Sequence, residues 1–151
     1  MSSFKTFYSE KYTYDPEEGV ARFHYSYDRE VFFEEVLKFK SDKAEPILFH
    51  LHLALGISYY KAYLAPEIKV LSGELNREMA EFWDTVYTKG LGEFFYQNKI
   101  DFRNLVRFPY SDKEIPPAEE IGVKNRALVP LGGGKDSLVT AGILQEKGIG
   151  F

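Results

Sequence analysis

Residues 127–144 read ALVPLGGGKDSLVTAGIL and predict a strand, a glycine turn and a helix in immediate succession. The apolar run 127–131 is typical of a strand, and residues 137–144 are typical of a helix. Between them, three consecutive glycines, 132–134, let the backbone adopt positive φ and point successive N–H groups at an anion. The start of the helix directs the positive end of its dipole at the same place. We therefore expect the turn to hold phosphate groups, with ATP as the favoured ligand.

Two common nucleotide-binding motifs do not fit this loop. The pattern GxxxxGK[ST] requires a glycine at the position of Val129 and Ser or Thr at the position of Asp136. The dinucleotide pattern GxGxxG could use Gly132 and Gly134, but it then meets Ser137 where Gly or Ala would allow close helix packing. The turn therefore belongs to another class of phosphate loop.

The loop resembles the PP-loop, S-G-G-x-D-S, of the ATP pyrophosphatase superfamily. Gly133, Gly134, Asp136 and Ser137 match this pattern, and Gly132 replaces its first serine. Because glycine lacks the serine hydroxyl, a phosphate contact at Gly132 must rely on the backbone N–H.

The PP-loop resemblance implies a role for each polar side chain of the loop. Asp136 would help to arrange magnesium and pyrophosphate, Ser137 would bond a phosphate oxygen, and Lys135 would offset negative charge. A structural alternative stays open, in which Asp136 or Ser137 only caps the helix that follows a plain glycine turn.

The residues before the loop are numerous enough for one compact domain, and the chain's 13 Phe and 11 Tyr can supply its core. Strands are predicted over residues 11–15 and 20–27, joined by a turn at 16–19, because the second strand alternates apolar and polar residues. Residues 31–39 suit a strand or a short helix, and continuity with the hairpin favours a third strand of an antiparallel meander.

Helical patterns follow the meander. Pro46 suits the first turn of an apolar helix through Lys61, which we expect to be buried nearly all round. A second helix is predicted from about residue 74 toward 96, with a kink or a split at Gly90 and Gly92. A short strand and turn are predicted over residues 101–110.

The predicted fold class is α+β. An antiparallel β meander packed with aromatic-rich helices forms domain 1–125, and residues 126–151 form the first β-loop-α unit of a truncated α/β domain of the PP-loop, adenine nucleotide α-hydrolase-like kind. A polar linker with two prolines, residues 111–118, precedes this second domain. Because such a domain needs several strand and helix units, we expect an N-terminal fragment whose adenine pocket and further magnesium ligands lie beyond residue 151.

The composition of the chain narrows its partners and its location. A formal net charge of −4 and a pI near 5.5 disfavour nucleic-acid binding. The sequence has no cysteine, no secretory signal and no long uninterrupted apolar stretch, so we expect a cytoplasmic protein without a membrane span. The oligomeric state does not follow from the sequence.

Two segments before the loop, residues 56–61 and 90–98, mix glycine, aromatic and charged residues densely and could line a substrate cleft. The candidate contact residues are Tyr59, Tyr60, Lys61, Glu93 and Tyr96. The alternative is an ordinary aromatic core with Lys61 and Glu93 pointing to water. A metal site at His50 and His52 is not expected, because side chains two residues apart on a helix diverge.

Residues 56–61, 90–96 and 128–139 together resemble the UDP-N-acetylmuramoyl-L-alanyl-L-glutamate epimerase family of bacterial peptidoglycan synthesis. The resemblance implies inversion of the terminal L-glutamate of a UDP-linked muramoyl dipeptide, with ATP and magnesium, through an acyl-adenylate. It identifies no catalytic base. Two alternatives stay open: another PP-loop adenylating enzyme that amidates its substrate or modifies tRNA, and a non-catalytic binding domain. These residues alone are expected to be inactive and to bind ATP weakly, because one turn and one helix end cannot enclose the base.

Overall fold

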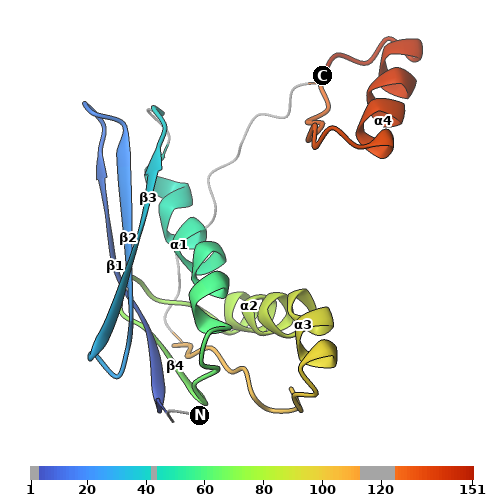
Figure 1. The fold of residues 1–151 in the computed structure, drawn as a ribbon. Coiled ribbons are helices and arrows are strands. Elements are labelled where there is room, and N and C mark those ends of the chain that lie inside the picture. Colours follow the sequence, from blue (N-terminus) through green and yellow to red (C-terminus); the bar gives the residue numbers. More distant parts are fainter. Residues whose placement is uncertain (1–3, 42–43, 113–124) are drawn as a thin grey trace. The chain divides into compact units, whose positions relative to one another are not determined.

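A computed structural model describes residues 4–41, 44–112 and 125–151 of the chain. The chain divides into two compact units, residues 1–115 and 116–151 (Figure 1). The predicted linker at residues 111–118 lies outside the described residues except for its first two positions. Each unit is described by itself.

The first unit contains a four-stranded sheet in the order β3-β2-β1-β4. Three strands form the predicted antiparallel meander: β1 (Thr6–Asp15), β2 (Val20–Tyr27) and β3 (Val31–Lys38). The fourth strand, β4 (Glu67–Val70), pairs with β1 in the parallel direction. The sheet is therefore mixed, and with the helices it confirms the α+β fold class.

The sequence did not predict the first residues of β1 or strand β4, and these two parts of the sheet pair with each other. Strand β1 begins at Thr6 rather than at residue 11, and its residues Thr6–Ser9 pair with β4. The Thr6 hydroxyl donates a hydrogen bond of 2.7 Å to the Glu67 carboxylate across this junction. A β-bulge at Glu10, where the register shifts between Ser9 and Lys11, divides the newly found part of β1 from the predicted part.

Alternation along β2 places one face of the sheet in the core. Ala21, Phe23, Tyr25 and Tyr27 are fully buried, as the period-two pattern predicted. His24 lies on the opposite face, where its Nε2 is 3.7 Å from the Glu34 carboxylate.

Helix α1 (Glu45–Tyr60) lies along the buried face of the sheet (Figure 1). Its proline occupies the first turn, as predicted. The helix is less buried than its composition indicated, because the side chains of Ile47, Ala54 and Ser58 are exposed. A helix that packs against only one sheet and one neighbouring helix leaves the rest of its surface exposed to solvent.

Helices α2 (Arg77–Gly90) and α3 (Gly92–Gln97) replace the single long helix of residues 74–96, so the predicted split at Gly90 and Gly92 is confirmed. The Asn76 side chain caps α2 by accepting a hydrogen bond of 2.8 Å from the N–H of Met79. Because the side chain of Asn76 takes this role, α2 begins two to three residues later than predicted.

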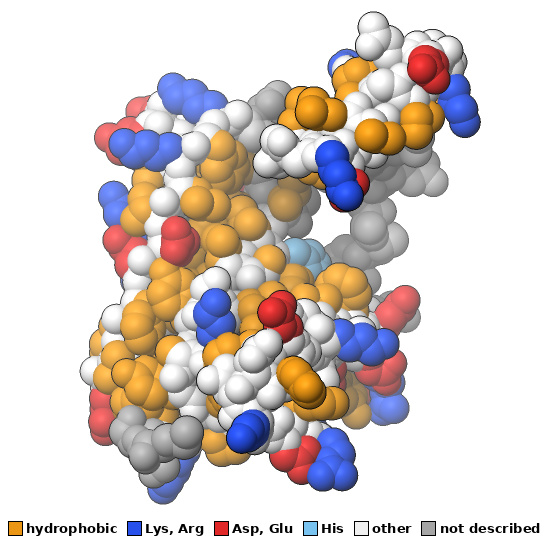
Figure 2. All heavy atoms as spheres, turned by 45° about the vertical axis from the view of Figure 1, so that its right-hand side comes forward, with side chains coloured by type: hydrophobic (Ala, Val, Ile, Leu, Met, Phe, Trp, Pro, Cys, Tyr) orange, Lys and Arg blue, Asp and Glu red, His pale blue; other side chains and the backbone are white. Residues whose placement is uncertain are grey.

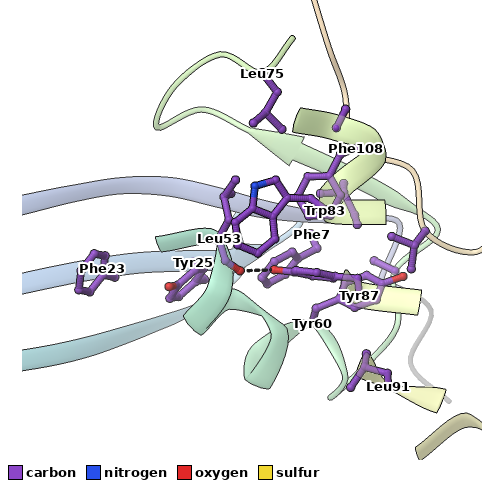
Figure 3. Packing of buried hydrophobic residues seen from close by; sticks show 14 of the residues in the cluster. Phe7, Phe23, Tyr25, Leu53, Tyr60, Leu75, Trp83, Tyr87, Leu91 and Phe108 are labelled. Atoms are coloured by element: carbon purple, nitrogen blue, oxygen red, sulfur yellow. Dashed lines mark hydrogen bonds between the residues drawn. The ribbon is translucent and has the colours of Figure 1, made fainter. Parts of the chain in front are cut away.

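Tyrosine hydroxyls join α1 to its neighbours. Tyr25 of β2 donates to the carbonyl of His52 at 2.8 Å. Tyr87 of α2 donates to the carbonyl of Leu53 at 2.7 Å, the bond drawn as a dashed line in Figure 3. Burial raises the pKa of both hydroxyls well above the ordinary value, so both keep the proton that they donate. These bonds fix α1 between the sheet and α2.

The predicted strand at residues 101–110 is wrong. The segment contains a turn and an irregular chain, and Phe108 inserts into the core against Tyr87, with ring centroids 4.8 Å apart. The N–H of Phe108 donates to the Asp84 carboxylate at 2.7 Å. The Asp84 side chain of α2 therefore supplies the acceptor that a neighbouring strand would supply if this segment were in a sheet.

In the second unit, the predicted helix is present as α4 (Lys135–Glu146). Gly148 follows it with φ of +65°, and the N–H of Ile149 bonds the carbonyl of Leu144 at 2.9 Å, which is a Schellman C-cap. The predicted strand at residues 127–131 is wrong as a regular strand, because residues 125–151, as described, pair only through one parallel bridge between Arg126 and Gly150. A parallel bridge between the residues before and after a helix has the connectivity of a β-α-β unit.

No helix in the described ranges is both long and apolar enough to cross a membrane.

Gly56 allows α1 to approach α2. A Cβ at Gly56 would lie 2.8 Å from the Tyr87 hydroxyl and 3.1 Å from Cε1 of Tyr25, both buried in the core. We expect Gly56→Ala to lower the free energy of unfolding by about 1–3 kcal/mol, because overpacking displaces the Tyr87 hydroxyl from Leu53. Gly90→Ala is the control: a Cβ there meets nothing within 4 Å, so the change should be neutral or stabilise by up to about 1 kcal/mol. Urea unfolding of both variants checks this, and equal stability would contradict it.

His52 makes the stability of the first unit sensitive to pH. The side chain is fully buried, its Nε2–H donates to the carbonyl of His24 at 3.1 Å, and within the described residues its Nδ1 has no hydrogen-bond partner. Burial lowers its pKa from 6.5 to about 4.

Between pH 6.5 and 4 the unfolded chain therefore binds a proton at His52 that the folded chain does not bind. We expect stability to fall as the pH drops through this window, by up to about 3 kcal/mol from this group. His52→Gln should remove that part of the slope, whereas His24→Gln, on the outer face, should retain it. Unfolding free energies measured at several pH values distinguish the two variants. If stability fell with pH equally in both variants, His52 would not be the group responsible.

Candidate functional site

The glycine loop of the second unit leads directly into the start of α4. Gly133 has φ of +77°, a left-handed conformation that favours glycine, and Gly134 is the N-cap residue of α4 in an extended conformation. Of the three consecutive glycines, only Gly133 has positive φ.

The space in front of the loop is open. A Cβ built on any of Gly132, Gly133 or Gly134 would meet nothing within 4 Å. The first N–H groups of a helix lack partners within the helix, so the start of α4 presents donors and the positive end of a dipole beside this space.

The polar side chains of the loop are at its surface. Lys135 and Asp136 are exposed in the first turn of α4, and Ser137 donates from its hydroxyl to the carbonyl of Gly134 at 2.8 Å. The N-cap residue is Gly134 and no side chain caps the helix, so the alternative in which Asp136 or Ser137 is the cap is wrong.

A complete metal site is not formed within residues 4–41, 44–112 and 125–151, where no three His, Cys, Asp or Glu side chains gather. Asp136 stays a prediction as a single magnesium ligand. His50 and His52 diverge as expected: the His50 Nδ1 accepts a bond of 3.4 Å from the Trp83 indole, whereas His52 points to the sheet.

The first unit has a cavity of about 600 Å³ at the C-terminal ends of α1 and α3. Lys61, the C-cap residue of α1, and Asn98, the C-cap residue of α3, both line it. The two segments that the sequence singled out, residues 56–61 and 90–98, therefore meet at one cavity.

The candidate contact residues take different positions around this region. Lys61 lines the cavity, whereas Glu93 and Tyr96 are exposed on α3 and are not among its lining residues. Tyr60 is fully buried in the core, where its ring centroid is 5.7 Å from that of Phe7. Tyr59 donates from its hydroxyl to the Glu35 carboxylate at 2.7 Å, and burial raises its pKa to about 12.

Lys61 is the one lining residue among the sequence candidates, and the lining residues that were not candidates include Tyr63, Phe94, Asn98 and Asp101. Phe94 and Asn98 lie four residues apart on one face of α3, and the Nδ2 of Asn98 donates to the carbonyl of Phe94 at 2.8 Å. This spacing was readable from the sequence once the boundaries of α3 were known.

Strained backbone surrounds the same cavity. Leu64, Lys99 and Asn104 have positive φ of 52°, 55° and 61°, and each of them lines the cavity or precedes a residue that does. Non-glycine residues in this conformation persist where the surrounding structure enforces it, often at ligand sites.

Comparison with known proteins identifies the family. The profile of the MurL N-terminal domain matches residues 1–151. A Xanthomonas oryzae pv. oryzae protein named UDP-N-acetyl-alpha-D-muramoyl-L-alanyl-L-glutamate epimerase is 40% identical over 99 residues, which are 66% of this chain and 22% of the relative. Relatives of the same name from Micromonospora sp. and Salinispora tropica are 34% and 32% identical over 91% of this chain.

The matches cover 34% and 33% of the Micromonospora and Salinispora relatives, so this chain spans about a third of their length. No solved structure matches the chain. The chain belongs to the MurL N-terminal domain family.

Proposed function

We propose that these residues are the N-terminal part of an ATP-dependent epimerase that inverts the terminal L-glutamate of UDP-N-acetylmuramoyl-L-alanyl-L-glutamate in cytoplasmic peptidoglycan precursor synthesis. The observation that carries the proposal is the glycine loop, with Gly133 at φ of +77° before the exposed start of α4, in a chain whose relatives are named for this epimerisation.

The chemistry of inversion explains why such an enzyme would use ATP. Removing the α-proton beside a free carboxylate places a second negative charge next to the first. Transfer of AMP to the carboxylate neutralises that charge, so the α-proton becomes more acidic, and pyrophosphate leaves. Reprotonation from the opposite face and hydrolysis then give the D-glutamyl product and AMP.

The loop residues fit a departing pyrophosphate. The open space before Gly132 to Gly134 admits phosphate oxygens close to the backbone, and the α4 amides can donate to them. Ser137 would turn its hydroxyl from the Gly134 carbonyl to a phosphate oxygen, and Lys135 would balance charge. Asp136 would hold magnesium, which stabilises the developing charge on the leaving group.

The surface of the second unit supports a larger domain around the loop. Leu128, Leu138, Val139 and Ile143 are exposed, and hydrophobic side chains appear over the surface of this unit (Figure 2). Helices of an α/β domain bury such residues against a sheet. We infer that the remaining two thirds of a protein of the relatives' length supply that sheet, the adenine pocket and the proton-transfer groups.

The reaction can be tested in the protein at the length of its relatives. With ATP, magnesium and the L-glutamyl precursor in deuterated water, we expect AMP, pyrophosphate and a D-glutamyl product that carries deuterium at Cα. Chromatography of the nucleotides and chiral analysis after hydrolysis measure these products. Formation of ADP instead of AMP, or of a carboxamide product, would contradict the proposal and favour another ATP-using reaction.

A pair of serine substitutions tests the role of the loop backbone. Gly133→Ser forces a side chain into positive φ, so we expect at least about a tenfold loss of kcat/KM for ATP as the amides shift. Gly132→Ser is the matched control, because its φ is not positive and a Cβ there meets nothing within 4 Å. It should keep activity or raise ATP affinity through the added hydroxyl. Equal loss in both variants, with unchanged folding by circular dichroism, would count against the assigned geometry.

A further inference from the structure

The cavity of the first unit has a lining that differs from a phosphate site. Its walls combine the rings of Tyr63 and Phe94 with aliphatic side chains such as Leu64 and Ile100. Its volume of about 600 Å³ falls within the range of about 300–1,000 Å³ that is usual for small-molecule sites. Aromatic and aliphatic walls of this kind bind a flat, largely apolar group best.

The charges at the cavity balance one another. Lys61 contributes a positive charge, and within the described ranges it forms no ion pair. Asp101 contributes a negative charge that Arg103 neutralises at 2.7 Å. The C-terminal ends of α1 and α3 add the negative end of their dipoles. A diphosphate or a dicarboxylate is therefore a poor occupant of the interior, and a neutral group is a good one.

Polar contacts are available at the cavity wall for a neutral ring with hydrogen-bonding edges. The Nδ2 of Asn98 is engaged with the Phe94 carbonyl, so the amide oxygen is the group of Asn98 that can accept a bond from a ligand. Lys61 can donate to a ring carbonyl or to a phosphate at the rim. Uracil matches this set, because it is planar and neutral and carries one N–H donor between two carbonyl acceptors.

We propose that this cavity binds the uridine end of a UDP-linked substrate, with uracil against Tyr63 and Phe94 and the first phosphate toward Lys61. The inference rests on the proposed function for the presence of a UDP group. It assigns this group to the first unit, apart from the loop that takes the phosphates of ATP. The sugar, the peptide and most of the negative charge of the substrate then lie outside the cavity.

A second hollow, on the outer face of the sheet, is a weaker candidate for the same group. Arg29, His24 and Phe32 line it together with Glu10 and Lys11, and Arg29 already pairs with Glu10. The Glu10 carboxylate accepts a hydrogen bond of 2.6 Å from the Ser26 hydroxyl, and it lies 3.5 Å from Nε of Arg29. An open sheet face, where Glu10 and Arg29 already pair, offers less burial to a nucleobase than the cavity does.

Binding of UMP to the 151-residue chain tests the proposal without requiring the reaction. We expect calorimetry to show a UMP complex and saturation-transfer NMR to show the uracil protons in contact with protein. Phe94→Leu keeps apolar volume but removes the ring, and it should weaken UMP binding about tenfold. Gln97→Ala is the matched control, since Gln97 is exposed on the same helix and does not line the cavity.

Lys61→Ala separates the base from the phosphate. It should weaken UMP binding several-fold and leave uridine binding unchanged, whereas Lys89→Ala, which removes a charge outside the cavity lining, should affect neither ligand. Absence of UMP binding at millimolar concentration would overturn the proposal. So would AMP binding as tightly as UMP, because the cavity would then not select uracil.

The same variants distinguish this proposal from the proposed function. In the protein at the length of its relatives, Phe94→Leu should raise KM for the UDP-linked precursor with kcat nearly unchanged. An unchanged KM for that variant would refute the cavity assignment and leave the epimerase assignment intact. UMP binding that depends on Phe94, in a protein that does not epimerise the precursor, would support the cavity assignment and refute the reaction.

Discussion

The position of α1 depends on buried tyrosine hydroxyls that donate to its backbone carbonyls. Tyr25 and Tyr27 of β2 donate to His52 and Tyr60, and Tyr87 of α2 donates to Leu53, at distances of 2.6–2.8 Å. Each carbonyl oxygen can accept a second bond beside its helical one, so the core gains polar contacts without unwinding the helix. Because α1 is held from the sheet and from α2, its C-terminal end and Lys61 have a defined place at the cavity.

Local patterns in the sequence were sufficient for elements whose partners lie nearby in the chain. The alternation of Phe23, Tyr25 and Tyr27 predicted the buried face of β2, and Gly90 and Gly92 predicted the split between α2 and α3. The parallel pairing of Thr6–Ser9 with β4 could not be predicted in this way. It joins residues about sixty positions apart, and neither four-residue piece carries a strong pattern alone.

The candidate sites show the same limit. The loop was predictable because its glycines, Asp136 and Ser137 are consecutive in the sequence. The cavity was only half predictable: the two aromatic segments were singled out, but Glu93 and Tyr96 were chosen where Phe94 and Asn98 line the wall. The face of a six-residue helix depends on its first residue, and a one-residue error rotates the prediction by about 100°.

The contrast between the two sites suggests how binding energy is used in the proposed reaction. In that proposed reaction, the loop would offer backbone amides and exposed charge to groups that change charge, so its contacts would strengthen in the transition state. The cavity would offer apolar walls and balanced charge to the uridine group, which does not react. Contacts with a remote, unreactive group stabilise the ground state and the transition state equally. Their role is to position the substrate so that the reacting glutamate stays in place. A cavity with apolar walls and balanced charge therefore suits the end of the substrate that takes no part in the chemistry.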